Sequence, residues 1–285
     1  MRLVATVFLW LVTTIALAVA VPAMWAQRNV ASEDGYAALA ASAAEDAKLQ
    51  TAMASELTTQ ITALAADNGY DLNRDLVRGV AVAYTANAGF PGQFAAANRI
   101  AHRWMFTDSV QLAEGSDDGD RWLVDIAPML NDPSLKETLG NLDLDVPQTL
   151  MVPITVPETT ALRPGQLRQV ATWGPWVSVG ATILAGVFAL LTIAAARSRG
   201  KVLAALGISA LMVGAAGWAG LEVARRYVND ALNRTTGDIR QIADVMVNHA
   251  EDSLHQWLNV TLVAGGGLVL FGVLLSMLGG LRRND

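Results

Sequence analysis

The chain has 285 residues, of which 53% are apolar and 16% are charged, and its mean hydropathy is positive. This composition excludes an ordinary soluble domain and favours an integral membrane protein. The formal net charge of −6 gives no net attraction to a phosphate backbone, so we expect no nucleic-acid partner.

Four windows are each long and apolar enough to cross a hydrocarbon core about 30 Å thick as a helix. They are Leu3 to Trp25, Trp173 to Ala196, Val202 to Val223, and Trp257 to Leu281. Only the segment RSRGK joins the second window to the third. These two spans are therefore predicted to form a tight antiparallel hairpin in contact with the lipid bilayer.

Basic residues predict the orientation of these spans. If the chain crosses four times, one side receives Arg2, Arg197, Arg199, Lys201, Arg282 and Arg283. The positive-inside rule makes that side the cytoplasm. The loop 27–172 carries 19 acidic against 10 basic residues and is placed outside. Tryptophans at the expected outer boundary support this map, namely Trp25, Trp173, Trp176 and Trp257. We expect a multi-pass plasma-membrane protein with both termini cytoplasmic.

The first window is interpreted as an uncleaved signal anchor. A cleaved signal peptide is the alternative, because Ala18 and Ala20 have the A-x-A spacing of a cleavage site. The apolar run is longer than a signal core, however, and Pro22 follows the site closely. No cysteine occurs, so the large loop is expected to fold without disulfides.

The predicted fold is mainly α, a four-helix transmembrane bundle with a mostly helical extracytoplasmic domain that carries a small two-stranded β element. The predicted parts are an N-terminal transmembrane helix at 1–26, the extracytoplasmic domain at 27–172, a transmembrane hairpin at 173–224, an extracytoplasmic helical hairpin at 225–256, and at 257–285 a transmembrane helix with a short basic cytoplasmic tail.

The outer domain begins with helical signals. Apolar residues three or four apart predict one long or one broken amphipathic helix over Ala31 to Ala66. Gly69 is expected to end it in a left-handed conformation. A second helix is predicted over Leu72 to Tyr84, and the turn NAGFPG at Asn87 to Gly92 separates it from a third.

The third helix carries the main candidate surface. A helical wheel places Arg99 and Arg103 opposite the apolar face. Asn98 and His102 lie near the edge of that face, one turn apart, where their side chains can form a hydrogen bond. The apolar face consists of Phe94, Ala97, Ala101, Trp104, Met105 and Leu112. We favour paired arginines and a structural seam at this candidate interaction surface over a catalytic His102, because isolated ionisable residues are more often structural.

The rest of the outer domain has weaker signals. The acidic segment GSDDGD at 115–120 lacks the later Glu of a calcium loop and is predicted to be an exposed turn. RWLVDI and TLMVPITV are predicted strands, with Pro153 and Pro157 confining the second to an edge. Between them DPSLKETLG predicts a short helix with Ser134 as its cap.

Two helices are expected to continue the third and fourth spans and to turn at Thr235 to Gly237. Val228 and Leu232 face an apolar stripe on the second arm, formed by Ile239, Ile242, Met246 and Leu254. This hairpin is predicted to pack on the outer domain.

Small residues four apart in the spans predict close helix contacts in lipid. The helix-packing candidates are Gly214, Gly220, Gly272, Ser276 and Gly280. Glu222 is expected to pair locally with Arg225 and Arg226. The spans contain no central ionisable residue, which argues against an ion path.

Catalytic motifs are missing from the sequence. His249 and His255 lie six residues apart, about 240° around one helix, so that helix alone cannot bring them to one metal ion. The sequence contains no H-E-x-x-H, G-x-S-x-G, G-x-x-x-x-G-K or C-x-x-C motif. We therefore expect no catalytic residues, metal or cofactor.

The segments FAAANRIAHR and LVDIAPML, an Ile/Val-rich strand and the following membrane helical pair resemble a family of actinobacterial multi-spanning integral membrane proteins of unassigned function. The resemblance covers the outer domain and the spans, and it implies a Gram-positive host with a mycolate-type envelope. It implies no mechanism.

The expected function is that of a non-catalytic accessory or scaffold protein of a cell-envelope or respiratory membrane complex, with other membrane or envelope proteins as partners. The alternative is a lipid-handling envelope protein with a lipid ligand. A third hypothesis is an extracytoplasmic hydrolase that uses His102.

Overall fold

The computed structural model describes residues 2–67, 69–106, 121–125, 151–155, 167–233 and 237–281. The chain divides into two compact units. Unit 1 comprises Met1–Ser32, Val170–Ala231 and Ala250–Asp285, and unit 2 comprises Glu33–Gln169 and Leu232–His249. The protein is mainly α-helical, and in the described part four helices are long and apolar enough to cross a membrane.

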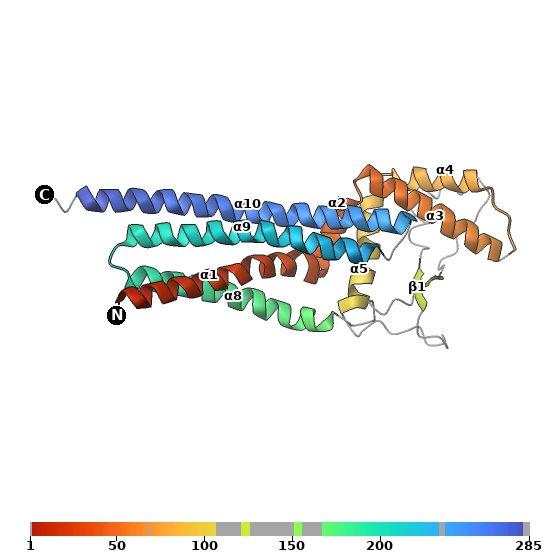
Figure 1. Ribbon diagram of the computed structural model, residues 1–285. Coiled ribbons are helices and arrows are strands. Elements are labelled where there is room, and N and C mark those ends of the chain that lie inside the picture. The colour runs from red at the N-terminus through yellow and green to blue at the C-terminus, as the bar shows by residue number, and fades with distance from the viewer. Residues whose placement is uncertain are drawn as a thin grey trace. The chain divides into compact units, whose positions relative to one another are not determined.

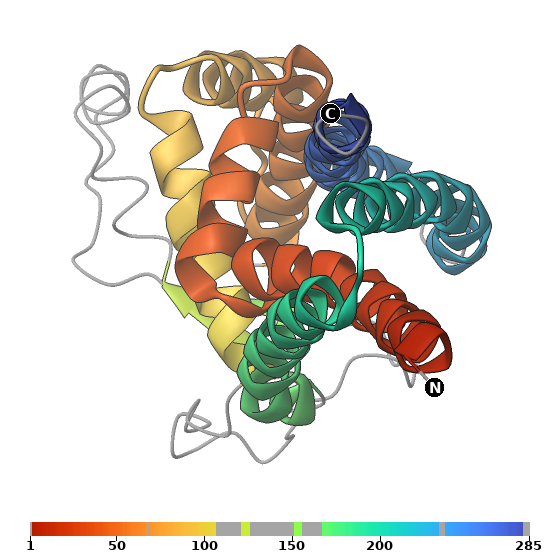
Figure 2. The same ribbon diagram turned by 90° about the vertical axis from the view of Figure 1, so that its left-hand side faces the viewer.

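These four helices are α1 (Arg2–Ala26), α8 (Arg168–Ala195), α9 (Arg199–Leu232) and α10 (Gly237–Leu281), and they run side by side through unit 1 (Figure 1). The end-on view in Figure 2 shows α8 beside α1 and α9 beside α10. Helices α1, α9 and α10 each contain a predicted span, and α8 ends at Ala195, one residue before the predicted end of the second span. Helices α9 and α10 continue well beyond those spans, as predicted, and Gly237 begins α10 with a φ of 66°.

A close glycine interface joins α9 to α10. Glycines occur at every seventh residue of α9, and they face positions that repeat every seventh residue of α10. The facing positions are Gly200 with Gly272, Gly207 with Gly265, and Gly214 with the side chain of Leu262 and the carbonyl oxygen of Leu258. A Cβ atom at Gly207 would lie 2.6 Å from the carbonyl oxygen of Gly265. The two backbones therefore touch, as small residues permit for helices in lipid.

Only some of the predicted packing residues lie in the interface between α9 and α10. Gly214 and Gly272 lie in the interface, and the backbone nitrogen of Ser276 lies 2.6 Å from where a Cβ at Gly200 would stand. Gly220 makes no close contact within the described part of the chain, because a Cβ there would meet nothing within 4 Å, and its predicted packing role stays a prediction. The surroundings of Gly280 lie outside the described residues. The predicted spacing of four missed Gly200, Gly207 and Gly265, which follow a period of seven.

Polar side chains attach α1 to the glycine-packed pair. The indole Nε1 of Trp10 donates to the carbonyl oxygen of Ala205 on α9 at 3.0 Å. One turn later, the hydroxyls of Thr14 and Ser209 are 2.8 Å apart. Buried hydrogen bonds of this kind hold helices together in lipid, where each is worth about 0.6 kcal/mol on average.

The last part of α1 runs into a π-helix, η1 (Gln27–Ala31). Of the two forms predicted after it, the broken helix is the one that occurs, as α2 (Glu33–Ala43) and α3 (Ala47–Asp67). The break lies at Asp46, whose carboxylate accepts from the backbone N–H of Lys48 at 2.7 Å. That side chain caps the start of α3, so α2 cannot run on into it.

Two asparagines set the next helix starts. Asn73 accepts from the backbone N–H groups of Asp75 and Leu76, so α4 (Arg74–Thr85) begins two residues later than predicted. Asn87 accepts from the backbone N–H of Gly89 at 2.7 Å. Helix α5 (Phe90–Phe106) consequently begins earlier than predicted. Gly69 has a φ of 81°, which confirms its left-handed conformation.

Aromatic and alanine side chains form the core of unit 2. Among the described residues, Phe90 is the largest fully buried side chain, and its ring meets that of Tyr84 edge to face at a centroid distance of 5.5 Å. Val245 of α10 belongs to the same core, with Ile242 and Met246 packed against it. The prediction that the second arm of the helical hairpin packs on the outer domain is therefore confirmed. The core residues are Ala40, Ala43, Ala44, Leu49, Tyr84, Phe90, Phe94 and Val245.

Two short strands, β1 (Arg121–Asp125) and β2 (Met151–Thr155), pair antiparallel with Arg121 opposite Thr155 and Asp125 opposite Met151. Pro153 lies opposite Leu123. The predicted acidic turn at 115–120, the predicted helix at 132–140 and Leu112 lie outside the described residues.

Candidate functional site

The candidate surface on α5 faces the first turn of α2. The guanidinium of Arg99 donates to the carboxylate of Asp34 at 3.1 Å. One turn on, Arg103 lies 3.8 Å from the carboxylate of Glu33. These pairs place α2 against α5, as the structural interpretation expected. Because the side chains of Arg99 and Arg103 are 40% and 54% exposed, the pairs contribute little stability, below about 1 kcal/mol each.

Of the two remaining members of this surface, Asn98 is partly buried and His102 is buried. The amide of Asn98 donates to the carbonyl oxygen of Phe94 at 2.9 Å, which is a bond within its own helix. His102 is 4% exposed. Its ring stacks on Phe106 at a centroid distance of 4.2 Å and lies 5.5 Å from Tyr36. Burial raises the pKa of the Tyr36 hydroxyl above its ordinary value of 10.0, so this residue is a neutral phenol at physiological pH.

The contacts at this surface are ring packing and ion pairs. The imidazole of His102 stacks on the ring of Phe106 and lies beside the tilted ring of Tyr36, and the two arginines on the same helix contact carboxylates. Asn98, Arg99, His102 and Arg103 thus share one stretch of α5, but only the arginines present exposed charge. The aromatic partners of His102 lie at Tyr36 and Phe106, and the wheel of α5 alone gave no signal for Tyr36.

The other two histidines occupy separate positions. His249 bonds through Nδ1 with the carbonyl oxygen of Val245 at 3.0 Å. His255 stacks on Trp218 of α9 at a centroid distance of 3.9 Å. Within the described ranges, no group of three or more His, Asp or Glu residues is placed to hold a metal ion. Arg225 was predicted to pair with Glu222. Its guanidinium instead lies 3.6 Å from the carboxylate of Glu251 on α10.

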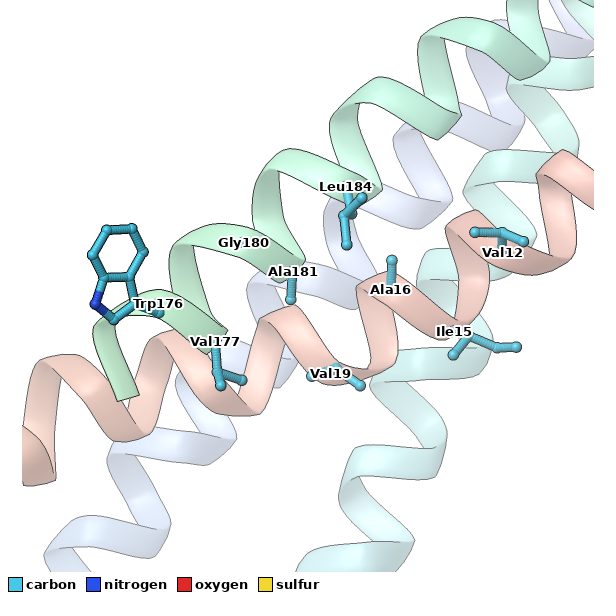
Figure 3. Close-up of a pocket in the computed structure, with 9 residues that line it drawn as sticks. All are labelled: Val12, Ile15, Ala16, Val19, Trp176, Val177, Gly180, Ala181 and Leu184. Carbon is cyan, nitrogen blue, oxygen red and sulfur yellow. The ribbon is translucent and has the colours of Figure 1, made fainter. Parts of the chain in front are cut away.

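An apolar groove lies between α1 and α8 in unit 1 (Figure 3). Its volume is about 440 Å³, which is within the range of small-molecule sites. The floor is made of small residues, Ala16 of α1 and Gly180 and Ala181 of α8, and Trp176 stands at one end. The remaining lining residues are Val12, Ile15, Val19, Val177 and Leu184.

A polar group lies beyond the Trp176 end of this groove. The side-chain oxygen Oε1 of Gln27 is buried, and no donor among the described residues reaches it. It lies against Gly174, where a Cβ would come within 2.6 Å of it. The segment W-G-P-W at 173–176 marks this end of the groove in the sequence. It combines a glycine, a helix-interior proline and two exposed tryptophans. From the sequence, those tryptophans indicated only the expected outer boundary of the membrane.

Comparison of the chain with protein-family models, with curated proteins and with solved structures found no match.

Proposed function

We propose that this protein is a non-catalytic accessory or scaffold protein of a membrane complex, of the cell envelope or the respiratory chain, and that it holds a partner's transmembrane helix on the face of α10 turned away from α9. The observation that carries this proposal is the length and shape of that face. It is apolar throughout, and it has a glycine at its centre.

The geometry of α10 separates two faces. Gly265 and Gly272 face α9, whereas Gly267 points about 200° away from Gly265 at 100° per residue. A Cβ at Gly267 would meet nothing within 4 Å. Large exposed side chains flank this glycine along the same face, namely Val260, Val263, Leu270, Phe271, Leu274 and Leu278.

The face is long enough for a helix that spans the membrane. Leu278 follows Val260 by eighteen residues, which is about 27 Å of helix, close to the thickness of a hydrocarbon core of about 30 Å. A glycine between large apolar residues lets a second backbone approach closely. Two site residues of unit 2 support the non-catalytic part of the proposal, because Arg99 pairs with Asp34 and His102 stacks on Phe106.

The test is photo-crosslinking in the native host membrane. A photo-crosslinking amino acid replaces Val263, whose side chain is 77% exposed, and adducts are identified by mass spectrometry. We expect one discrete protein adduct, and we expect Gly267→Leu to abolish it. Gly186→Leu is the matched control, because Gly186 on α8 also has nothing within 4 Å.

The same crosslinker in place of Leu190 on α8, which is 68% exposed, reports background capture. Lipid adducts alone at Val263, or one set of protein adducts shared by both positions, would overturn the proposal. So would mild-detergent purification that returns only the lone chain. Loss of the adduct in Gly186→Leu would also count against the assigned face.

Lipid handling is the second candidate function, and the groove between α1 and α8 is the observation that favours it. This groove lies on other helices than the α10 face, so the two functions are separable by mutation.

A further inference from the structure

We propose that the turn between α8 and α9 binds the phosphate groups of anionic phospholipids in the headgroup layer of the membrane. Its cations are Arg197, Arg199 and Lys201, and all three are exposed. The site is separate from the partner face on α10 and does not depend on the function proposed above. Three observations carry this inference: the position of the turn, the lack of acidic partners among the described residues, and the spread of the three cations.

The turn lies where two spans leave the hydrocarbon. Helix α8 ends at Ala195 and α9 begins at Arg199, and both helices are long and apolar enough to cross a membrane. Backbone outside a helix is not tolerated in lipid-exposed hydrocarbon, and a connection this short has no length to reach far beyond the membrane surface. The turn therefore lies at the level of the lipid headgroups. Figure 1 shows that α1 begins and α10 ends at the same end of unit 1.

The positive charge of this turn is not balanced by nearby acidic side chains. The sequence contains no Asp or Glu between Glu158 and Glu222. None of the three basic side chains forms an ion pair within the described part of the chain. Arg225, towards the other end of α9, by contrast lies 3.6 Å from the carboxylate of Glu251. The turn is therefore a patch of uncompensated positive charge that attracts anions.

The direction of the helices increases this unbalanced charge. The N-terminus of a helix carries partial positive charge, so acidic residues are favoured in its first turn. Helix α9 has no acidic residue there and begins instead with Arg199 and Lys201. Arg197 follows the end of α8, where a cation is favourable, but it adds a third positive charge to the turn. An anion beside the turn would reduce the repulsion among these groups.

The spread of the cations favours a layer of headgroups over a single free anion. Residues two apart in a helix point about 200° away from each other. Arg199 and Lys201 therefore flank Gly200, which is buried against α10, and their side chains do not close on one phosphate ion. Each can reach a different phosphate in the headgroup plane, because long basic side chains extend to that level. Near an anionic membrane surface, each basic residue favours binding by about fivefold.

The experiment measures which phospholipids stay with the full chain. The purified protein is reconstituted into nanodiscs of phosphatidylglycerol and phosphatidylcholine in equal amounts and moved into mild detergent, and its retained lipids are quantified by mass spectrometry. We expect phosphatidylglycerol to exceed phosphatidylcholine by about fivefold, the preference that one cation gives to the lipid it contacts. The triple variant Arg197→Gln, Arg199→Gln and Lys201→Gln should retain the two lipids in about equal amounts.

The matched control is a second triple variant, Lys48→Gln, Arg74→Gln and Arg78→Gln. It also removes one lysine and two arginines, from exposed positions of α3 and α4, and it should keep the wild-type preference. An unchanged preference in the first triple variant, or an equal loss in both, would overturn the inference. Thermal unfolding of each variant in detergent establishes that the fold is intact.

A second measurement does not depend on a folded variant. Phosphatidylglycerol or phosphatidylcholine with a diazirine near the glycerol end of its acyl chain is added to the wild-type chain, and the labelled peptides are mapped. We expect phosphatidylglycerol to label 197–201 preferentially. The preference should fall when salt is raised from about 0.1 M to 1 M, because the Debye length shortens from about 10 Å to about 3 Å.

Equal labelling by both lipids, or a preference that salt leaves unchanged, would overturn the inference. So would loss of the label in an excess of inorganic phosphate at constant ionic strength, because that result would assign the turn to a free phosphate ion.

Discussion

Different interactions stabilise the interior of each of the two units. In unit 1, α9 and α10 meet through backbone contacts at glycines, and α1 joins them through hydroxyl and indole hydrogen bonds. In unit 2, aromatic rings and alanines bury apolar area around Phe90. The difference follows from the solvent of the spans. Lipid gives no hydrophobic driving force between helices, so close approach and polar contacts replace it.

The largest expected effect tests the apolar side of this comparison. Phe90→Ala removes a ring that is 1% exposed, so it should lower the free energy of unfolding of unit 2 by about 3 to 5 kcal/mol. Hydrogen exchange of the α3 and α5 amides measures this loss. Ile61→Ala on α3, where the side chain is 37% exposed, is the control. A loss below about 1 kcal/mol for Phe90→Ala would contradict a burial-driven core.

A single methyl group tests the glycine side. In Gly272→Ala the new Cβ would meet the backbone nitrogen of Ala204 and lie 2.6 Å from the carbonyl oxygen of Gly200. Backbone atoms cannot give way cheaply, so overpacking should cost about 1 to 3 kcal/mol. Thermal unfolding in detergent, followed by tryptophan fluorescence, measures it. Gly266→Ala on the same helix has open space and should leave unfolding unchanged or raise the midpoint.

The hydroxyl contact between α1 and α9 should have a smaller effect. Thr14→Val removes the partner of Ser209 while keeping the shape of the side chain. The pairwise coupling from a double-mutant cycle with Ser209→Ala should be about 0.6 kcal/mol and below about 1.7 kcal/mol. A coupling of zero would mean that each hydroxyl bonds only within its own helix. Thr14 donates to the carbonyl oxygen of Trp10, and Ser209 donates to that of Ala205.

The same glycine-to-alanine change should have the opposite sign in unit 2. Gly79 lies within α4, and a Cβ there meets nothing within 4 Å. Gly79→Ala should therefore stabilise α4 by up to about 1 kcal/mol through helix propensity alone. Hydrogen exchange of the α4 amides measures the gain. Destabilisation at Gly79 would show that glycine sensitivity is not confined to the spans.

The smallest effect is a pH dependence in unit 2. Burial raises the pKa of Tyr36 above 10.0, so above pH 10 the unfolded chain loses this proton while the folded chain keeps it. The Tyr36 contribution is complete below pH 10 and is lost as pH rises through the folded pKa. Tyr36→Phe should flatten the decline of the unfolding free energy above pH 10. An unchanged slope in denaturant titrations would contradict the burial of this hydroxyl.

Sequence reasoning found what depends on local pattern. Hydropathy located the four spans, and the left-handed conformation of Gly69 followed from backbone chemistry. It could not find contacts between distant elements. Tyr36, whose ring contacts His102, lies 66 positions before it along the chain. Arg225 forms an ion pair with Glu251 of α10, although Glu222 is only three residues away in the sequence. The period of seven in α9 was present in the sequence, but a search for spacings of four passed over it.

That seven-residue register makes the α9 and α10 hairpin sensitive to its own length. Three facing pairs share one alignment from Gly200 to Gly214, so the contacts require every turn between them to be counted. Deleting one residue of α9 between Gly207 and Gly214 would rotate everything beyond it by about 100° and swing Gly214 away from Leu258. A conservative substitution in this stretch changes one contact at a time. An insertion or deletion would misalign all the facing positions beyond it.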